Sequence, residues 1–101
     1  MALAPAQPTE LLENDRVRVT RWDFPPNSET GHHVHEYDYV VVPVVPGRLV
    51  LVDDQGKRNE AELTVGGAYN RDAGTSHNVI NEGDAPVAFV EVELKEPRAK
   101  G

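Results

Sequence analysis

The chain has 101 residues, and its 10 Lys and Arg residues against 17 Asp and Glu residues give a formal net charge of −7. This length is typical of a single domain. The acidic charge disfavours binding to nucleic acid and to anionic membranes, because like charges repel. Cysteine is absent, which excludes disulfides, thiolate metal ligands and cysteine nucleophiles. The composition therefore predicts one soluble globular domain.

No targeting or membrane segment is predicted. The longest apolar run, residues 40–45, is too short to cross a bilayer, and residues 1–8 lack the positive start and long apolar core of a signal peptide. We therefore expect a cytoplasmic protein. Two prolines predict a flexible or partner-bound N-terminal arm over residues 1–8, and residues 97–101 are expected to fray, which leaves residues 9–96 for the domain.

Short β-strands are predicted along nearly the whole chain. Valine occurs 15 times, and β-branched residues favour the half-buried surface of a pleated sheet. Residues 16–19 and 90–94 alternate between apolar and charged side chains, as strands with one buried apolar face do. Residues 39–45 are almost entirely apolar, which is typical of a strand buried on both faces. About eight such strands without helices indicate a sandwich, a jelly roll or a small barrel.

Two further segments are relevant to how the strands pair, within one chain and between two copies. Residues 49–52 are predicted to form a hairpin with the following segment through the turn at residues 53–56. Residues 9–13 could form either one helical turn or an added edge strand. A sheet edge presents unpaired backbone groups that a second copy can complete. We therefore expect a homodimer in which residues 9–13 and the proline-containing arm pair across a two-fold axis.

The four histidines occupy two places in the sequence: His32, His33 and His35 are close together, and His77 stands apart. Alternate residues of a strand point to the same face, so His33 and His35 can converge on one metal ion, whereas His32 is interpreted as a rim or surface residue. Neutral imidazole binds several transition metals without thiolate ligands. By itself, a His-x-His pattern is more often a solvated surface pair than a metal site.

The residues around these histidines resemble the two signatures of the cupin family. Residues 31–47 carry the first, with Gly, then His-x-His, then a closing Gly. Residues 66–81 are similar to the second, Gly-x5-Pro-x-Gly-x2-His-x3-Asn, at every fixed place except the proline, which is Asp72 here. Two spaced motifs in the correct order are far more specific than either one alone.

The resemblance implies an all-β cupin jelly-roll β-barrel in one domain, with a metal near its mouth held by His33, His35 and His77. The family's fourth ligand, a glutamate, would fall at position 39 or 40, where this sequence has Tyr39 and Val40. The expected site is therefore three neutral histidines around a divalent transition metal (Fe, Mn, Ni or Zn), with open positions for water or substrate.

Tyrosines are the candidate catalytic residues of this site. Tyr39 lies an even number of residues from His33 and His35, so on a regular strand its side chain points to the same inner face. Glu36 and Asp38 lie on the opposite face and would need a β-bulge to point inward. A phenol with a pKa of about 10 replaces a carboxylate poorly at neutral pH, unless the metal draws off its proton. Tyr39 and Tyr69 are instead expected to donate hydrogen bonds to developing charge. The alternatives are barrel packing for Tyr39 and an ordinary strand role for Tyr69 and Arg71.

The resemblance leaves two classes of function open. Three-histidine cupins resemble dioxygenases that cleave diketones, oxidise thiols or attack phenolic compounds, and a metal on neutral ligands should attract a small anionic substrate. The alternative is a binding protein without turnover that senses or carries a small carboxylate. Residues 30–43 also look like a bacterial subgroup associated with β-alanine breakdown. A serine hydrolase and a phosphate loop are disfavoured, because their motifs are absent.

Overall fold

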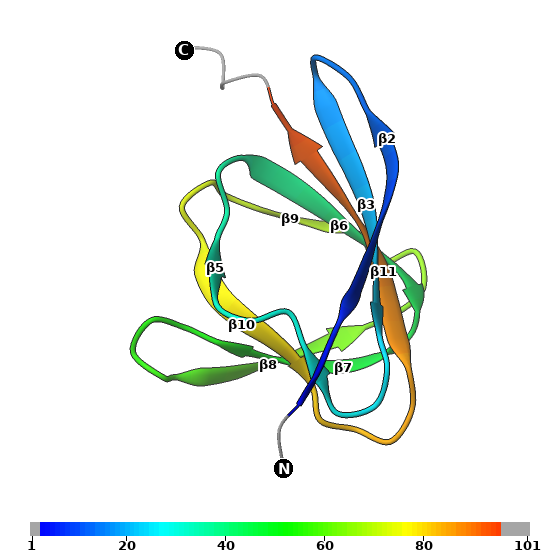
Figure 1. Ribbon diagram of the computed structural model, residues 1–101, viewed down its shortest axis with the longest axis vertical. Helices are drawn as coiled ribbons and strands as arrows, with labels where there is room; N and C mark the ends of the chain where they lie inside the picture. Colours follow the sequence, from blue (N-terminus) through cyan, green and yellow to red (C-terminus); the bar gives the residue numbers. More distant parts are fainter. Residues whose placement is uncertain (1–2, 96–101) are drawn as a thin grey trace.

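The computed structural model describes residues 3–95, which form eleven β-strands and no helix (Figure 1). Accordingly, no helix that could span a bilayer is found in this part of the chain. The strands, in chain order, are β1 Ala4–Pro5, β2 Gln7–Glu13, β3 Val17–Phe24, β4 Ser28–Glu29, β5 His33–Val34, β6 Asp38–Val45, β7 Gly47–Val52, β8 Arg58–Leu63, β9 Tyr69–Arg71, β10 Ser76–Asn81 and β11 Val87–Leu94.

These strands form two facing sheets (Figure 1). One sheet has the order β1-β4-β10-β7-β8, with β5 also paired to β10, and the other has the order β2-β3-β11-β6-β9. Every pairing is antiparallel except the one between β1 and β4. The predicted all-β jelly roll is thereby confirmed. Among residues 3–95, however, the pairings leave two sheets and do not close them into the expected barrel.

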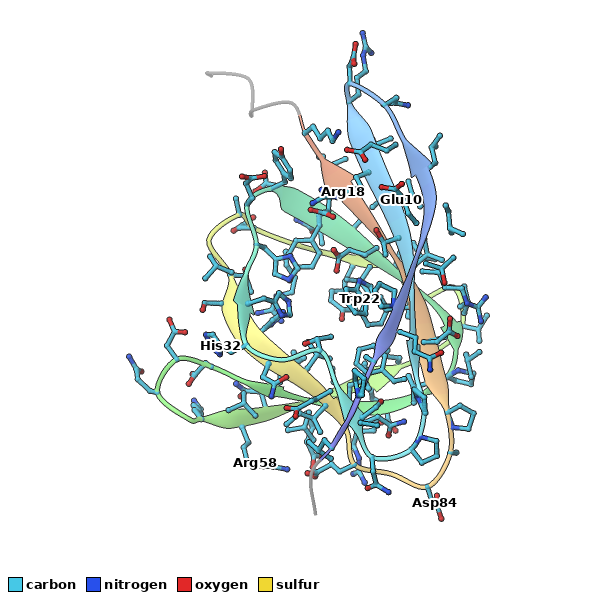
Figure 2. The ribbon with its side chains drawn as sticks, viewed as in Figure 1. Glu10, Arg18, Trp22, His32, Arg58 and Asp84 are labelled. Atoms are coloured by element: carbon cyan, nitrogen blue, oxygen red, sulfur yellow. The ribbon has the colours of Figure 1, made fainter. Side chains whose placement is uncertain are left out.

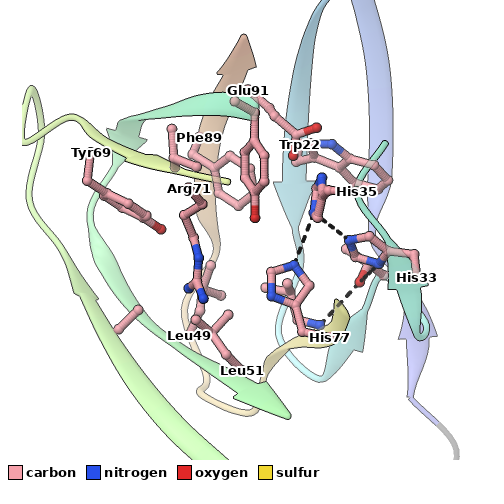
Figure 3. A pocket seen from close by; sticks show the side chains of 15 residues that line it. Trp22, His33, His35, Leu49, Leu51, Tyr69, Arg71, His77, Phe89 and Glu91 are labelled. Atoms are coloured by element: carbon pink, nitrogen blue, oxygen red, sulfur yellow. Dashed lines mark hydrogen bonds between the residues drawn. The ribbon is translucent and has the colours of Figure 1, made fainter. Parts of the chain in front are cut away.

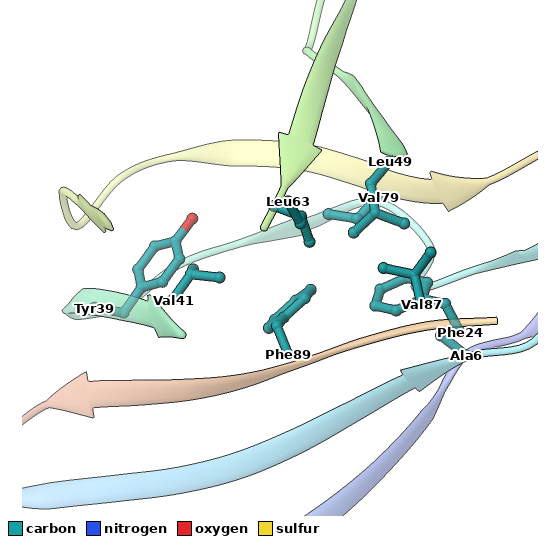
Figure 4. Close-up of a cluster of buried hydrophobic side chains, with 9 residues drawn as sticks. All are labelled: Ala6, Phe24, Tyr39, Val41, Leu49, Leu63, Val79, Val87 and Phe89. Atoms are coloured by element: carbon teal, nitrogen blue, oxygen red, sulfur yellow. The ribbon is translucent and has the colours of Figure 1, made fainter. Parts of the chain in front are cut away.

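The core lies between the sheets and consists of residues from several strands of both sheets (Figure 4). In β6, Tyr39, Val41 and Pro43 are buried, and the residues between them are half-exposed. The expectation that this strand is buried on both faces is therefore wrong, because no further layer formed by residues 3–95 covers the outer face of its sheet. The apolar core comprises Ala6, Phe24, Tyr39, Val41, Leu49, Leu63, Val79, Val87 and Phe89.

The predicted hairpin is confirmed in β7 and β8, which pair from Gly47 opposite Leu63 to Val52 opposite Arg58. Its turn is closed by the Asp53 carboxylate, which accepts hydrogen bonds from the backbone N–H groups of residues 55 and 57, both at 2.9 Å. Such side-chain to backbone bonds stabilise tight turns.

The segment over residues 9–13 forms part of the edge strand β2, not a helical turn. All seven residues of β2 are exposed, and the strand pairs with β3. Of the residues expected in the arm, Ala4–Pro5 pair with β4 in one sheet and Gln7 begins β2 in the other, with Ala6 buried between them. Residues 1–2 and the predicted tail at residues 97–101 lie outside the described residues.

Candidate metal centre

Three histidines converge from two neighbouring segments at one end of the space between the sheets. His33 in β5 lies directly opposite His77 in β10. His35 follows β5, and its backbone N–H donates to the Thr75 carbonyl at 2.8 Å while its carbonyl accepts from the Gly74 N–H at 2.8 Å. Gly74 has a φ of +89°, a conformation that favours glycine. The turn of the second signature therefore fixes the position of His35 in the first.

The histidine rings point their Nε2 atoms at one another (Figure 3). The Nε2 atom of His35 lies 3.0 Å from that of His33 and 3.1 Å from that of His77. A metal held at about 2.1 Å by nitrogens at right angles would place those nitrogens about 3.0 Å apart. The three side chains therefore fit a metal ion, and each offers one ligand atom within 4.8 Å of the others.

The hydrogen bond of His33 Nδ1 determines which ring nitrogen of His33 carries the proton. Its Nδ1 lies 2.9 Å from the Gly31 carbonyl, which can only accept a hydrogen bond. A proton on Nδ1 leaves the Nε2 lone pair free for a metal, as in many metal sites. The Nδ1 atom of His77 is buried and has no hydrogen-bond partner among residues 3–95.

Burial keeps two of the ligands neutral. It lowers the pKa of His35 to about 4 and that of His77 to about 3, with the neighbouring His33 as the next cause in both cases. Protons compete with metals for imidazole nitrogen. At neutral pH, His35 and His77 are therefore in the form that binds a metal.

Tyr39 is the aromatic neighbour of this group and points inward, as its parity predicts. It is 2% exposed, and its ring stacks on His35 at a centroid distance of 3.9 Å. Burial raises the pKa of its phenol well above the usual value. The hydroxyl is therefore protonated at neutral pH, and it has no hydrogen-bond partner within the described chain.

A small cavity of about 30 Å³ lies between the histidines and the apolar core (Figure 3). Its polar lining includes the three histidines, Tyr39, Tyr69 and Arg71, and its apolar wall includes Leu49, Leu51 and Phe89. A wider hollow of about 280 Å³ adjoins it at His33 and His35 and opens outward. The histidines thus line both the small inner cavity and the wider outer hollow.

Comparison with known proteins decides the family, since residues 20–93 match the cupin domain family. The chain belongs to the cupin family. This match spans both signatures and the strands around them, as the sequence predicts.

Two relatives and one solved structure support this assignment. The beta-alanine degradation protein BauB of Pseudomonas aeruginosa is 50% identical over 90 residues, which are 89% of this chain and 94% of BauB. An oxalate-binding protein of Thermotoga maritima is 29% identical over 83 residues, which are 82% of this chain and 66% of that protein. A cupin domain from Bordetella pertussis Tohama I superimposes with a TM-score of 0.91 at 47% identity, covering 95% of this chain and 99% of that one.

Two glutamates near the site of this cupin were missed from the sequence. Glu91 and Glu93 in β11 are 8% and 7% exposed, so the charged face of residues 90–94 points inward, contrary to the expectation of a buried apolar face. Arg18 binds Glu93 through two hydrogen bonds of 2.9 and 2.8 Å. Both glutamates point to the same side of the strand as the buried Phe89, but the alternation by itself does not show which face is buried.

Glu91 lines both the inner cavity and the outer hollow. Burial raises its pKa to about 7, and the nearby charge of Glu93 adds to this rise. The cupin site therefore has a carboxyl group that is partly protonated at neutral pH beside the histidines.

The remaining histidine lies on the surface, as predicted (Figure 2). The Nε2 atom of His32 is 2.8 Å from both the Asp54 carboxylate and the Ser76 hydroxyl, and that hydroxyl donates to Asp54 at 2.6 Å. A hydrolytic triad needs the carboxylate and the serine on different ring nitrogens. This arrangement is therefore a surface hydrogen-bond cluster and not a triad.

Proposed function

We propose that this cupin is a metal-dependent oxidoreductase of the dioxygenase type that acts on a small anionic metabolite. The observation that carries the proposal is the convergence of three Nε2 atoms from His33, His35 and His77 beside a cavity. The proposed metal is a divalent transition metal (Fe, Mn, Ni or Zn), which supplies positive charge, open coordination positions and, in the case of iron, redox chemistry with O₂.

The charge of the site supports an anionic ligand. All three proposed ligands are imidazoles. The two positions at which the family's fourth carboxylate would fall hold Val40 and Tyr39, and burial keeps the phenol of Tyr39 protonated. The metal would therefore keep its full positive charge. One relative is named for binding of oxalate, which is a small dicarboxylate, and another for degradation of beta-alanine, which carries a carboxylate together with an ammonium group.

Tyr39 and Tyr69 are the proposed catalytic residues. Both line the inner cavity, and burial raises the pKa of both phenols, so both hydroxyls are donors at neutral pH. A donor placed at the reacting end of a ligand stabilises negative charge that develops there. The proposal is that one of these two hydroxyls, that of Tyr39 or that of Tyr69, gives this hydrogen bond.

A second candidate is a binding protein that holds a small carboxylate without turnover. It is favoured by the relative named as an oxalate-binding protein and by the small inner cavity of about 30 Å³. O₂ uptake by iron-reconstituted protein, measured over diketones, thiols and small carboxylic acids, separates the two functions. Substrate-dependent uptake supports the enzyme, whereas carboxylate binding without any uptake contradicts it and favours the binding protein.

A homodimer is also proposed, and the sheet that contains β2 supports it. Val17, Val19, Val90 and Val92 point away from the core, since their strand neighbours on either side face inward. They form an outer apolar face together with Val40, Val42, Leu94 and Leu12, which lie opposite them in the adjacent strands. Apolar sheet faces of this kind mark interaction surfaces. A second copy would cover this outer apolar face and the adjoining exposed β2.

The expected cytoplasmic location and the expected lack of nucleic-acid and membrane partners stay predictions.

A further inference from the structure

Arg71 is a half-buried cation for which the described residues provide no ion-pair partner. It lies in β9 directly opposite Tyr39 of β6, so both side chains leave the sheet on its inner face. Figure 3 shows its guanidinium between Tyr69 and His77, within the lining of the inner cavity. No carboxylate in residues 3–95 forms an ion pair with Arg71. Other arginines of the described chain do form such pairs: Arg18, Arg21, Arg48 and Arg58.

An unpaired guanidinium in this position is unfavourable by itself. Arginine stays charged at all relevant pH values, and a half-buried charge beside apolar groups such as Leu49 and Phe89 costs free energy unless an anion compensates it. Burial raises the pKa of Tyr39 and Tyr69, and the positive charge of Arg71 opposes this rise in both phenols. The guanidinium therefore faces the same space as the two hydroxyls.

The hydroxyl of Tyr39 is a second group without a partner in the same cavity. The residue is 2% exposed, and the oxygen is buried with no hydrogen bond of normal geometry in the described chain, although the Thr75 side chain lies near enough to oppose the rise in the pKa of the phenol. Buried polar atoms are nearly always hydrogen-bonded, and one without a partner costs about 1–3 kcal/mol. Both groups are donors, and a carboxylate offers only acceptors. One carboxylate would satisfy both.

We infer that Arg71 and the Tyr39 hydroxyl form a carboxylate-binding subsite behind the three histidines. The ligand is then a short molecule with a carboxylate at Arg71 and a second oxygen or nitrogen donor facing His35 and His77. This inference rests on the proposed function, because the metal defines where the second donor binds.

The volume of the inner cavity limits what the subsite can hold. At about 30 Å³ it has room for about two water molecules, which a carboxylate group could replace. The rest of the ligand must lie toward the histidines and the outer hollow beyond them, so the substrate class is a short carboxylic acid with a second polar group.

The test compares two metal-binding probes on zinc-loaded protein. Malonate carries two carboxylates on a short chain, whereas acetohydroxamate chelates a metal but has no carboxylate. Arg71→Met removes the guanidinium and keeps the length of the side chain. We expect this variant to lose malonate affinity by about tenfold or more, since a charge-assisted bidentate contact is lost. Zinc content and acetohydroxamate affinity should stay unchanged by calorimetry and metal analysis.

Two further variants complete the experiment. Tyr39→Phe keeps the ring beside His35 and should weaken malonate binding by about threefold or more, since it removes one neutral hydrogen bond. Arg48→Met, on the surface, is the matched control and should bind both probes like the parent protein.

The outcomes separate the inference from the proposed function. If Arg71→Met binds malonate as tightly as the parent while acetohydroxamate still binds, the subsite is overturned and the metal centre stands. The subsite is likewise overturned if the zinc-loaded parent binds acetohydroxamate but not malonate. If the parent binds neither zinc nor acetohydroxamate, the proposed function fails, and the subsite fails with it.

Discussion

The ring of Tyr39 lies nearly parallel to that of His35, with an angle of 18° between their planes and 3.9 Å between their centroids. Tyr39 occupies one of the two positions at which the cupin signature would place a glutamate ligand, and the other position holds Val40. In this protein the phenol packs against a proposed ligand and keeps its proton. A centre of three neutral ligands follows from this one substitution.

Restoring the carboxylate tests the consequence of that substitution. Tyr39→Glu should raise the affinity for zinc by about tenfold or more, because a fourth, negatively charged ligand joins the histidines. It should also weaken the binding of malonate, because the metal loses net positive charge. Competition with a chelating dye measures the zinc affinity, and Tyr39→Phe serves as the control with parent-like affinity. Equal zinc affinity in the two variants would contradict the proposed geometry.

The protonation of Glu91 should make stability depend on pH. Burial raises the pKa of this carboxyl from 4.5 to about 7, so between these values the folded state retains a proton that the unfolded chain has released. The folded state therefore loses stability as the pH rises through this window, and the contribution of Glu91 is fully present only below its unfolded pKa.

The variant Glu91→Gln does not titrate at this position. Its stability relative to the parent should therefore rise by about 3 kcal/mol between about pH 4 and about pH 8. Urea unfolding of the metal-free proteins at both pH values measures this difference. A difference that stays the same at both pH values would show that Glu91 titrates normally.

The contact between Arg18 and Glu93 should matter more than a surface ion pair. The Glu93 side chain is 10% exposed, so Arg18→Met leaves a nearly buried carboxylate without its partner and should cost about 3 kcal/mol of stability. The double variant with Glu93→Gln should recover part of this loss. Arg58→Met removes an exposed pair and should change little. Thermal unfolding that gives equal losses for Arg18→Met and Arg58→Met would refute this ranking.

The proposed dimer predicts that a charge on the outer apolar face will separate the subunits. Light scattering should give the parent protein twice its chain mass of 11.1 kDa, and Val92→Lys should give the chain mass alone. Val65 is 64% exposed but lies outside this face, so Val65→Lys is the matched control and should stay dimeric. A monomeric parent protein would reject the dimer.

Local sequence patterns predicted the part of the site that depends on spacing. The signatures identified His33, His35 and His77, and strand parity placed Tyr39 inside. Parity alone could not tell which face of residues 90–94 is buried, because an alternating strand has two possible orientations. Glu93 is accommodated by Arg18, which is 75 residues away in the chain and is brought beside it by the pairing of β11 with β3.

The sequence also could not predict the positions of Arg71 and of the N-terminal residues, because both depend on strand pairing between distant segments. The position of Arg71 opposite Tyr39 follows from the register of β9 on β6, which no local pattern encodes. Residues 4–8 belong to the segment that is predicted from its two prolines to be an N-terminal arm. Proline is tolerated at sheet edges, and the folded chain uses these residues at the edges of both sheets.

The most direct test of the account is the metal content of the protein, measured by elemental analysis after purification without added metal. The account predicts about one transition-metal ion per chain in the parent protein and in the surface control His32→Ala, and a loss of most of this metal in His77→Ala. If His77→Ala holds as much metal as the parent, or if the parent holds none even after exposure to zinc, the three histidines are not a metal centre.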